Sequence, residues 1–435
     1  MLRQESKYEL RKIAALFPNM IEDMAIECYL SLITLKYISQ KGIGLSDVAD
    51  YEKYRRVSDY FGNIKNTEYP ADAISSIISS LVQKFGDDLY VLLIRFSENV
   101  ANLFVNNIDL TVLPGWELAS LKDNEKNKEL ENIVQAVNIL SAMYYSRRTL
   151  SAASYTLYNL AKSLLNVTVE DSFVDYVAGS GISTFAITDG KAKEYKLYDI
   201  RKKSSISLLS ILFDVEDLSI EERNLSSKQI DVAVADKIFM DPPLGFAFID
   251  SDFQCDGVAT RDLSGICILR ASQALKDEGM AVITSTAPYL AGSQKQIQSV
   301  REYIIKNYML KAVISLPGSW YGSNINTNLI ILSKDRNNEV IFIDASKFKI
   351  DTESESYVDA TGNDITSKIV DIINGKLVTD MSNVVAYDNL NVGNIAPIAY
   401  IKPVEGSTVS IDEINTELQT LYSKIGNILQ DLSVL

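Results

Sequence analysis

The chain lacks histidine altogether, although it has 435 residues. This absence excludes Ser-His-Asp and Cys-His nucleophilic sites, histidine-ligated metals and histidine general bases in one step. The chain also has little cysteine: Cys28, Cys255 and Cys267 are scattered, with no spacing that suggests a disulfide framework or zinc. We therefore expect no metal centre in this protein.

Long apolar runs and a surplus of positive charge are missing as well. No run reaches the roughly 18 residues that a membrane span needs. The charged start "MLRQESKYELRK" is unlike a signal peptide, so we expect a cytoplasmic protein. The formal net charge of −15 argues against a general nucleic-acid binder, because neutralising phosphates requires surplus Lys and Arg. A local basic patch, or a more basic partner, would still permit contact with DNA.

The remaining composition, 47% apolar and 23% charged, is typical of a globular protein, and the length predicts about two or three domains. Residues 1–135 show apolar residues at helical spacing, which predicts a helical N-terminal domain. Residues 136–345 alternate short apolar runs with helical stretches, which predicts an α/β domain with a largely parallel sheet covered on both faces. We expect residues 346–435 to form a C-terminal extension that ends in a helix. The runs expected as strands are "SFVDYVAGSG", "YKLYDI", "DKIFMDPP", "GMAVITS", "KAVISLPG", "TNLIILSK" and "VIFIDA".

The last helix carries apolar residues at alternating spacings of three and four, which is the seam of a coiled coil. This pattern favours a partner helix, although an amphipathic helix packed on its own chain remains the alternative. The seam residues are Ile411, Ile414, Leu418, Leu421, Ile425, Ile428, Leu432 and Leu435.

A glycine-rich turn follows the first expected strand, in "VDYVAGSGISTF". Gly179, Ser180 and Gly181 stand where the backbone can approach a ligand and where a helix N-terminus offers free N–H groups. Asp199 ends the next run about twenty residues later, the usual device for holding a ribose diol. A plain strand-to-helix turn and an exposed acid explain each feature separately. Together they predict a nucleoside-cofactor site.

Proline is scarce, yet two of the nine prolines are adjacent in "FMDPPLGF", residues 239–246. Pro242 and Pro243 fix two φ angles and remove two N–H donors, so a strand cannot continue through them. They would hold the carboxylate of Asp241 and the nearby carbonyls rigidly at the strand's end. An ordinary turn is the alternative explanation.

The acid and two prolines resemble the hallmark of N6-adenine methyltransferases, an Asn, Asp or Ser followed by two prolines and an aromatic residue. Over nearly its whole length, the chain more closely resembles the modification subunit of type I restriction–modification systems. The resemblance rests on the order of several pieces: "YYSRR" (144–148), "DYVAGSG" (175–181), "AVISLPGSWYGSNINTNLIILSK", "VIFIDASKF" and "YDNLNVGNIAPIAYI".

The resemblance implies a Rossmann-like methyltransferase sheet that uses S-adenosylmethionine to methylate adenine N6 in DNA, with the target base flipped out of the duplex. It implies that Asp241 and Pro242 accept hydrogen bonds from the amino group and that Pro243 stiffens the site. Phe246 is our own candidate for contacting the base, because the family's aromatic residue is missing from position 244. The resemblance also implies a specificity subunit bound through the C-terminal helix, with a restriction subunit as a further candidate partner. The implied cofactor-binding residues are Tyr145, Ser146, Asp175, Gly179, Ser180, Gly181 and Asp199.

Four positions depart from the family pattern. Leu244 replaces the aromatic residue that would stack on the base, Tyr176 and Arg147 replace prolines, and Ile182 replaces a glycine. Two hypotheses follow. The first is an active DNA adenine-N6 methyltransferase subunit, and the alternative is a catalytically degenerate scaffold that binds a partner through the same fold.

Overall fold

The computed structural model describes residues 2–15, 23–41, 108–143, 153–201, 204–243, 253–320, 323–351 and 356–401. The expected coiled-coil helix lies outside these residues, as do Tyr145, Ser146, Leu244 and Phe246. Within the described ranges, no helix is long and apolar enough to cross a membrane.

The described part of the N-terminal region is helical, as the sequence predicts. Its helices are α1 (Gln4–Ala15), α2 (Asp23–Lys41) and α6 (Asp123–Met143), with short 3₁₀ turns at Leu110–Val112 and Leu118–Ser120. Helix α6 begins with two acidic residues in its first turn, where negative charge favours the helix dipole. Its C-terminal half is buried against the rest of the protein.

A nine-stranded sheet forms the centre of the molecule, in the order β13-β10-β8-β9-β7-β4-β1-β2-β3. Its strands are β1 (Ser172–Asp175), β2 (Glu194–Asp199), β3 (Leu218–Glu222), β4 (Ala235–Met240), β7 (Leu275–Thr286), β8 (Leu310–Trp320), β9 (Ser323–Ser333), β10 (Glu339–Asp344) and β13 (Ser382–Ala386). Two small hairpins flank it: β5 (Phe253–Cys255) with β6 (Val258–Thr260), and β11 (Lys349–Asp351) with β12 (Ser356–Val358).

The prediction of a largely parallel sheet is confirmed. Strands β3, β2, β1, β4 and β7 are mutually parallel, and β8 is parallel to β10. Strand β9 runs antiparallel between β7 and β8, and β13 is an antiparallel edge. All seven expected runs contribute to strands, whereas the two edge strands β3 and β13 were not expected.

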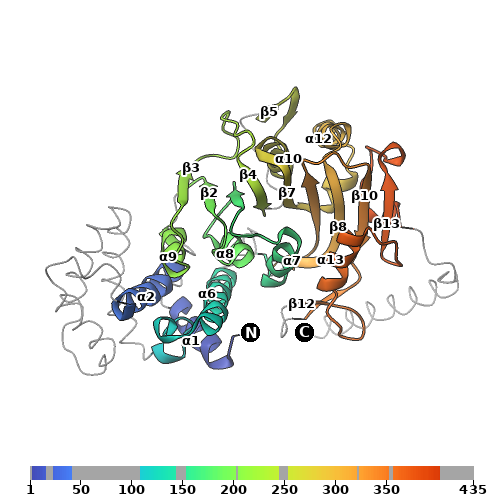
Figure 1. Cartoon of the computed structure of the whole chain (residues 1–435). Coiled ribbons are helices and arrows are strands. Elements are labelled where there is room, and N and C mark those ends of the chain that lie inside the picture. Colours follow the sequence, from blue (N-terminus) through green and yellow to red (C-terminus); the bar gives the residue numbers. More distant parts are fainter. Residues whose placement is uncertain are drawn as a thin grey trace, which may run out of the picture.

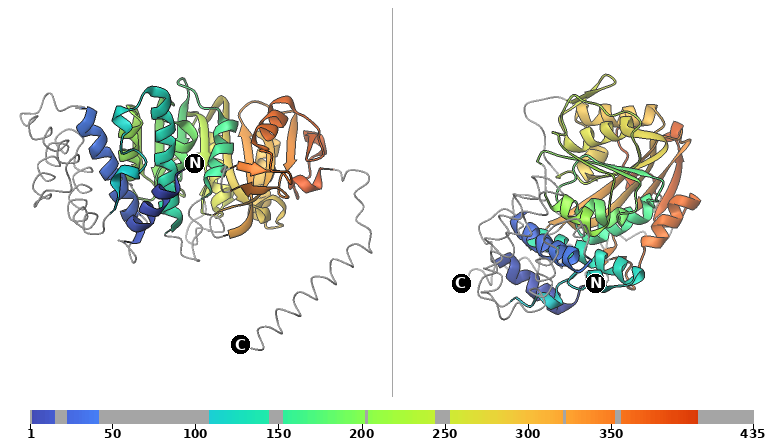
Figure 2. Two further views of the ribbon diagram at one scale, coloured as in Figure 1. Left: turned by 90° about the horizontal axis from the view of Figure 1, so that it is seen from below. Right: turned by 60° about the vertical axis from the view of Figure 1, so that its left-hand side comes forward.

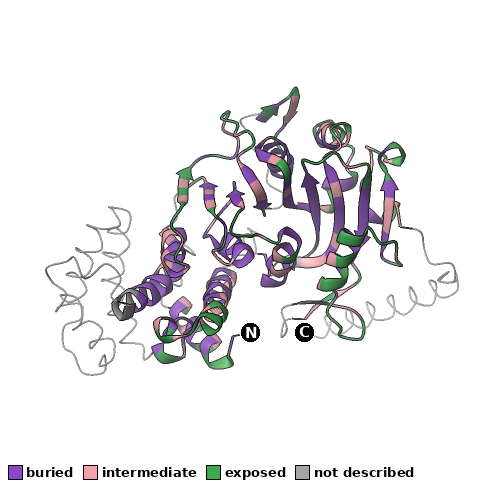
Figure 3. Ribbon diagram, viewed as in Figure 1, coloured by how far each residue is buried: buried purple, intermediate pink, exposed green. Residues whose placement is uncertain are grey.

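Helices cover both faces of the sheet (Figure 1). Helices α6, α7 (Tyr155–Leu165), α8 (Ile182–Thr188), α9 (Ser204–Leu212) and α13 (Thr366–Gly375) share one hydrophobic core, and we call this side the α7 face. Helices α10 (Leu263–Ala274), α11 (Ala287–Ala291) and α12 (Lys295–Lys306) share the other core, on the α10 face. The strands between these layers are mostly buried, and the exposed residues gather on the outer helix surfaces and loops (Figure 3).

The N-terminal helices pack directly beside the sheet's helices rather than standing apart, as Figure 2 shows. Lys126 of α6 forms an ion pair of 2.5 Å with Asp214, which follows α9. The hydroxyl of Tyr37 donates to the same carboxylate at 3.2 Å. One buried cluster therefore includes residues from both regions, and the division of the chain at residues 135 and 345 stays a prediction.

Candidate active site

Three acids meet at the carboxyl edge of the sheet. Asp175 and Asp199 are the last residues of β1 and β2, and Asp241 directly follows β4. Because β1 lies parallel to and between β2 and β4, the three residues leave the sheet at the same edge. The structure thus brings the glycine turn, the second-strand acid and the acid before the prolines into one place.

Asp241 is half-buried on the α7 face, where its Oδ2 atom accepts a hydrogen bond of 2.9 Å from the hydroxyl of Tyr158. Burial raises the pKa of this carboxyl to about 7, and the tyrosine hydroxyl acts in the opposite direction. Of the prolines that follow, Pro242 is buried and Pro243 is exposed. The carboxyl therefore changes its charge near neutral pH.

Asp175 is fully buried and organises the turn that follows β1. Its Oδ1 accepts the Val177 N–H at 2.9 Å, and its Oδ2 accepts the Ser183 hydroxyl of α8 at 3.1 Å. Burial raises its pKa well above the usual range, and the neighbouring Asp241 carboxylate raises it further. Asp175 therefore stabilises the glycine turn, because it binds one residue before the glycines and one residue after them.

The two glycines of the turn, Gly179 and Gly181, have different surroundings, so a side chain would be disfavoured there for different reasons. Both have positive φ, +53° at Gly179 and +84° at Gly181. A Cβ atom on Gly181 would lie 3.1 Å from Ile206 of α9, so this residue permits close packing. Among the described residues, a Cβ atom on Gly179 would meet only the Val177 carbonyl, at 3.8 Å, so they leave the backbone there uncovered. Ser180, between them, is buried.

Asp199 is tied to this turn. Its Oδ2 accepts the Gly179 N–H at 2.8 Å, and its Oδ1 accepts the Arg201 N–H at 3.3 Å. A carboxylate has about four acceptor positions, so these two bonds leave room for hydroxyl donors. The acid at the end of β2 both closes the glycine turn and retains capacity for a ligand.

Tyr176 lies on the opposite face from Asp175. Its ring is buried and stacks on Tyr198, with centroids 4.8 Å apart and planes 10° apart. The guanidinium of Arg223 lies 4.1 Å from the Tyr198 ring, and that of Arg270 lies 5.4 Å from the Tyr176 ring. We call these four residues the aromatic brace. The residue that replaces the family's proline is therefore a packing residue of the α10 face.

Asp231 links the brace to the β3–β4 connection. It accepts the Tyr176 hydroxyl at 2.9 Å and forms an ion pair of 2.6 Å with Arg223. Arg270 donates to the carbonyls of Leu225 and Gln229 at 2.6 and 2.9 Å. These contacts fix the connection that leads into β4 and Asp241.

Tyr158 is the functional candidate that the sequence did not reveal. An aromatic residue in an amphipathic helix is typical of core packing, and the chain segment alone does not show that its hydroxyl meets Asp241. The sequence also did not point to a second polar group: the Ser285 hydroxyl and the Asn328 amide nitrogen are buried and find no hydrogen-bond partner among the residues that the structure describes. These two residues are paired across β7 and β9.

The parallel strands β3-β2-β1-β4-β7, the antiparallel β9 and the acids at the carboxyl edge define a Rossmann-like methyltransferase fold. The chain belongs to the N-6 DNA Methylase family, whose model matches residues 164–396, more than half of the chain.

Individual proteins are similar to this chain in sequence or in fold. The type I restriction enzyme MpnII methylase subunit of Mycoplasma pneumoniae is 28% identical over an alignment of 182 residues that covers 38% of this chain and 33% of that protein. The match thus spans about a third of the length of this curated relative. A type I restriction-modification methyltransferase subunit from Streptococcus thermophilus has a similar fold, with TM-score 0.62, 14% identity and coverage of 92% of this chain and 100% of that one. A structure from the type I R-M system gives TM-score 0.53 and 13% identity over 99% and 98% of the two chains.

Family membership implies S-adenosylmethionine as the methyl donor, and the residues at the carboxyl edge fit such a group. The described residues leave the backbone of Gly179 uncovered, and Asp199 retains acceptor positions beside it. Tyr176 does not occupy this side, because its ring is packed on the α10 face.

Proposed function

We propose that this chain is the modification subunit of a type I restriction–modification-like complex and that it transfers a methyl group from S-adenosylmethionine to adenine N6 in DNA. The observation that carries the proposal is the placement of Asp241, Pro242 and Pro243 at the end of β4, beside the glycine turn and Asp199. This arrangement puts a rigid hydrogen-bond acceptor next to a candidate nucleoside site.

The cofactor, when bound, supplies an electrophilic methyl group. The backbone of Gly179, Ser180 and Gly181 would contact the cofactor. Asp199 would accept hydrogen bonds from its ribose hydroxyls. Asp175 would keep the turn in shape, because its carboxyl is already engaged by Val177 and Ser183. Tyr145 and Ser146 complete the proposed set from outside the described residues.

The amino nitrogen of adenine is a poor nucleophile because its lone pair is delocalised into the ring. The Asp241 carboxylate and the Pro242 carbonyl would accept its two N–H groups, localise the lone pair and orient it. The prolines fix these acceptors before the base arrives, which reduces the reorganisation needed in the transition state. With a pKa of about 7, ionised Asp241 would also take the proton that the amino group loses.

The base has to leave the duplex to reach this edge, at a cost of a few kcal/mol. Phe246 is the proposed contact for the flipped ring, because Leu244 stands where the family has its stacking aromatic. A stack of base on aromatic is worth roughly 1–3 kcal/mol, so this departure is expected to weaken base binding.

The proposal extends to partners and location. A specificity-type subunit would bind through the helix that the sequence predicts for residues 411–435 and would read the DNA target, and a restriction subunit is a further candidate partner. We place the complex in the cytoplasm. The support is the family assignment together with the similarity to a type I restriction enzyme methylase subunit.

Isothermal titration with S-adenosylmethionine tests the proposal. We expect binding by the wild type and about tenfold weaker binding by Asp199→Ala, because a hydrogen bond to a charged group contributes roughly 1.5–3 kcal/mol. Asp189→Ala is the matched control, since Asp189 caps the far end of α8 and pairs with Lys162 and Lys191. It should bind like the wild type.

The outcomes separate the two hypotheses. A folded wild type that binds no S-adenosylmethionine removes the proposal. Binding that is never followed by methylation of adenine-containing duplexes, with the specificity-type partner present, leaves the degenerate scaffold as the function.

A further inference from the structure

Tyr158 stands out because it is the one described side chain that donates a hydrogen bond to Asp241. It lies in the first turns of α7, a helix that begins at Tyr155 on the α7 face. Asp241 belongs to the end of β4, 83 residues further along the chain. The contact therefore joins two separate elements at the carboxyl edge of the sheet.

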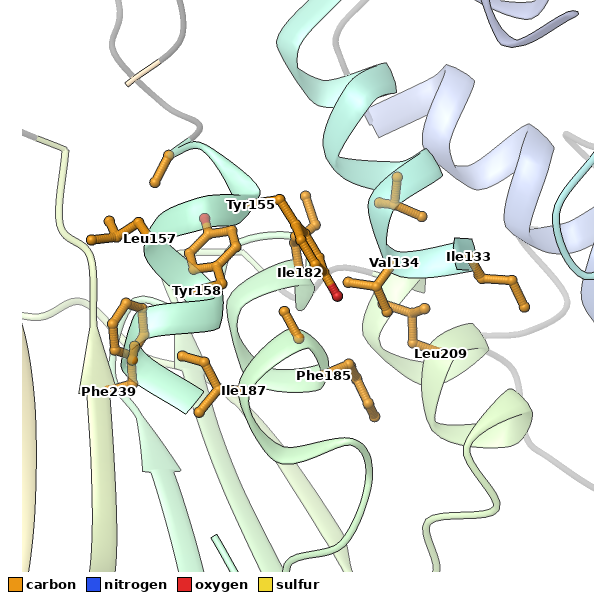
Figure 4. Close-up of a cluster of buried hydrophobic side chains, with 14 of the residues drawn as sticks. Ile133, Val134, Tyr155, Leu157, Tyr158, Ile182, Phe185, Ile187, Leu209 and Phe239 are labelled. Atoms are coloured by element: carbon orange, nitrogen blue, oxygen red, sulfur yellow. The ribbon is translucent and has the colours of Figure 1, made fainter. Parts of the chain in front are cut away.

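The ring of Tyr158 is held firmly. It is 3% exposed, and it packs edge-on against Phe239 of β4 and Tyr155 of α7, with centroids 6.0 and 6.5 Å away (Figure 4). Phe239 precedes Asp241 by two residues, so both side chains point to the same face of the strand. The strand that carries the carboxyl thus also supports the ring that binds it.

We propose that Tyr158 is a positioning residue for methyl transfer, which holds Oδ2 of Asp241 so that Oδ1 is presented to the amino group of the target base. The inference rests on the proposed function, because it assigns Asp241 the role of amino-group acceptor. A carboxylate bound at one oxygen by a rigid donor has a fixed plane. Without that donor it can rotate, and the acceptor is no longer aimed before the base arrives.

The hydroxyl also affects the charge of the carboxyl. The titratable groups that interact with this carboxyl are Asp175 of β1, Cys267 of α10 and Tyr158 itself, and Asp199 of β2 acts in turn on Asp175. Burial favours the neutral acid, whereas a hydrogen bond from Tyr158 favours the ionised form. Removing the hydroxyl is therefore expected to move the ionisation of Asp241 to higher pH.

The test compares Tyr158→Phe with Tyr195→Phe in the full chain with its specificity-type partner. Tyr195 is a matched control, because it is also buried and its hydroxyl bonds to Thr188 and to the Ala192 N–H, away from the acids. We expect Tyr158→Phe to lower kcat about tenfold at pH 7 and less at pH 9, because alkaline pH restores the ionised acid. Affinity for S-adenosylmethionine should stay within twofold of the wild type, and Tyr195→Phe should keep the wild-type pH profile.

The pKa of the Asp241 carboxyl can also be measured directly, by an NMR pH titration of the full chain labelled with ¹³C-aspartate. This measurement completes the test and needs no turnover. Asp241→Ala identifies the signal. A higher pKa in Tyr158→Phe than in the wild type supports the inference, and equal pKa values with equal pH profiles overturn it. A wild type that methylates no DNA would remove the proposed function, and the titration would still decide whether Tyr158 controls Asp241.

Discussion

Two dipeptides at the ends of neighbouring strands, Asp175-Tyr176 where β1 ends and Tyr198-Asp199 at the end of β2, show that one edge of the sheet has both a chemical and a structural role. Successive residues of a strand point to opposite faces, so the two acids lie together on the α7 face and the two tyrosines stack on the α10 face. The acids shape the candidate cofactor turn, whereas the tyrosines hold the connection that leads to β4. Neighbouring residues in the chain therefore have different roles: the acid belongs to the candidate site, and the tyrosine beside it packs on the other face of the sheet.

The charged groups of the two faces also differ, in whether they are paired with a group of opposite charge. On the α10 face each tyrosine ring lies next to a guanidinium, and Asp231 is paired with Arg223. On the α7 face, burial raises the pKa values of Asp175 and Asp241. Perturbed carboxyls are characteristic of functional sites, whereas balanced charges are characteristic of structural ones.

The largest expected effect is a loss of methyl transfer from a substitution on the α7 face. Asp241→Ala should reduce methyl transfer by at least about a hundredfold, because an aligned acid–base group contributes roughly 10²–10⁴-fold, while cofactor affinity stays nearly intact. The measurement is kcat for methyl transfer together with titration of S-adenosylmethionine.

Asp236→Ala is the control from the other end of β4, where the carboxylate pairs with Lys276 at 2.8 Å. It should retain methyl transfer. Equal activity of the Asp236 and Asp241 variants would mean that the acid before the prolines belongs only to a turn.

The next effect concerns the brace. Arg270→Ala should lower the free energy of unfolding by roughly 2–4 kcal/mol, because it removes a buried cation and leaves carbonyls of the β3–β4 connection without donors. Urea unfolding measures the loss. Arg336→Ala removes an exposed guanidinium 4.2 Å from the Tyr308 ring and should cost at most about 1 kcal/mol. Similar losses in the two variants would contradict a structural role for the brace.

The smallest effect separates the faces most cleanly. Tyr176→Phe removes the hydroxyl bond to Asp231 but keeps the ring stack, so we expect a loss of about 1 kcal/mol in unfolding free energy. Affinity for S-adenosylmethionine should be unchanged. A large loss of cofactor affinity would place Tyr176 at the cofactor rather than behind it.

Much of this architecture can be predicted from the sequence, because each buried strand appears in it as a short, mostly apolar run. The parallel sheet follows from these runs and from the helical stretches between them. The edge strand β3 was missed because "LSIEE" is short and half polar, as exposed edges often are. Its opposite, β13, is also short, with "SNVVA".

The candidate site was predictable only where the motif lies within one segment. Asp241 and the prolines are adjacent in the chain, and Asp199 follows the glycines by a familiar spacing. Tyr158 is far from Asp241 in sequence, so its contact depends on how α7 packs on β4. The interpretation of Tyr176 as a departure within the cofactor turn missed the alternation of the strand, which directs this ring to the other face.

The most direct test of the central claim is product analysis of a methyl-transfer reaction at pH 8. The wild-type chain, its specificity-type partner and an adenine-containing duplex would be incubated with S-adenosylmethionine labelled in the methyl group, with Asp241→Ala in parallel. We predict that digestion of the DNA yields labelled N6-methyladenine from the wild type and none from the variant. A folded wild type that binds the cofactor and the partner, yet leaves the DNA unlabelled, would contradict the claim that the acids on the α7 face belong to an active methyl-transfer site.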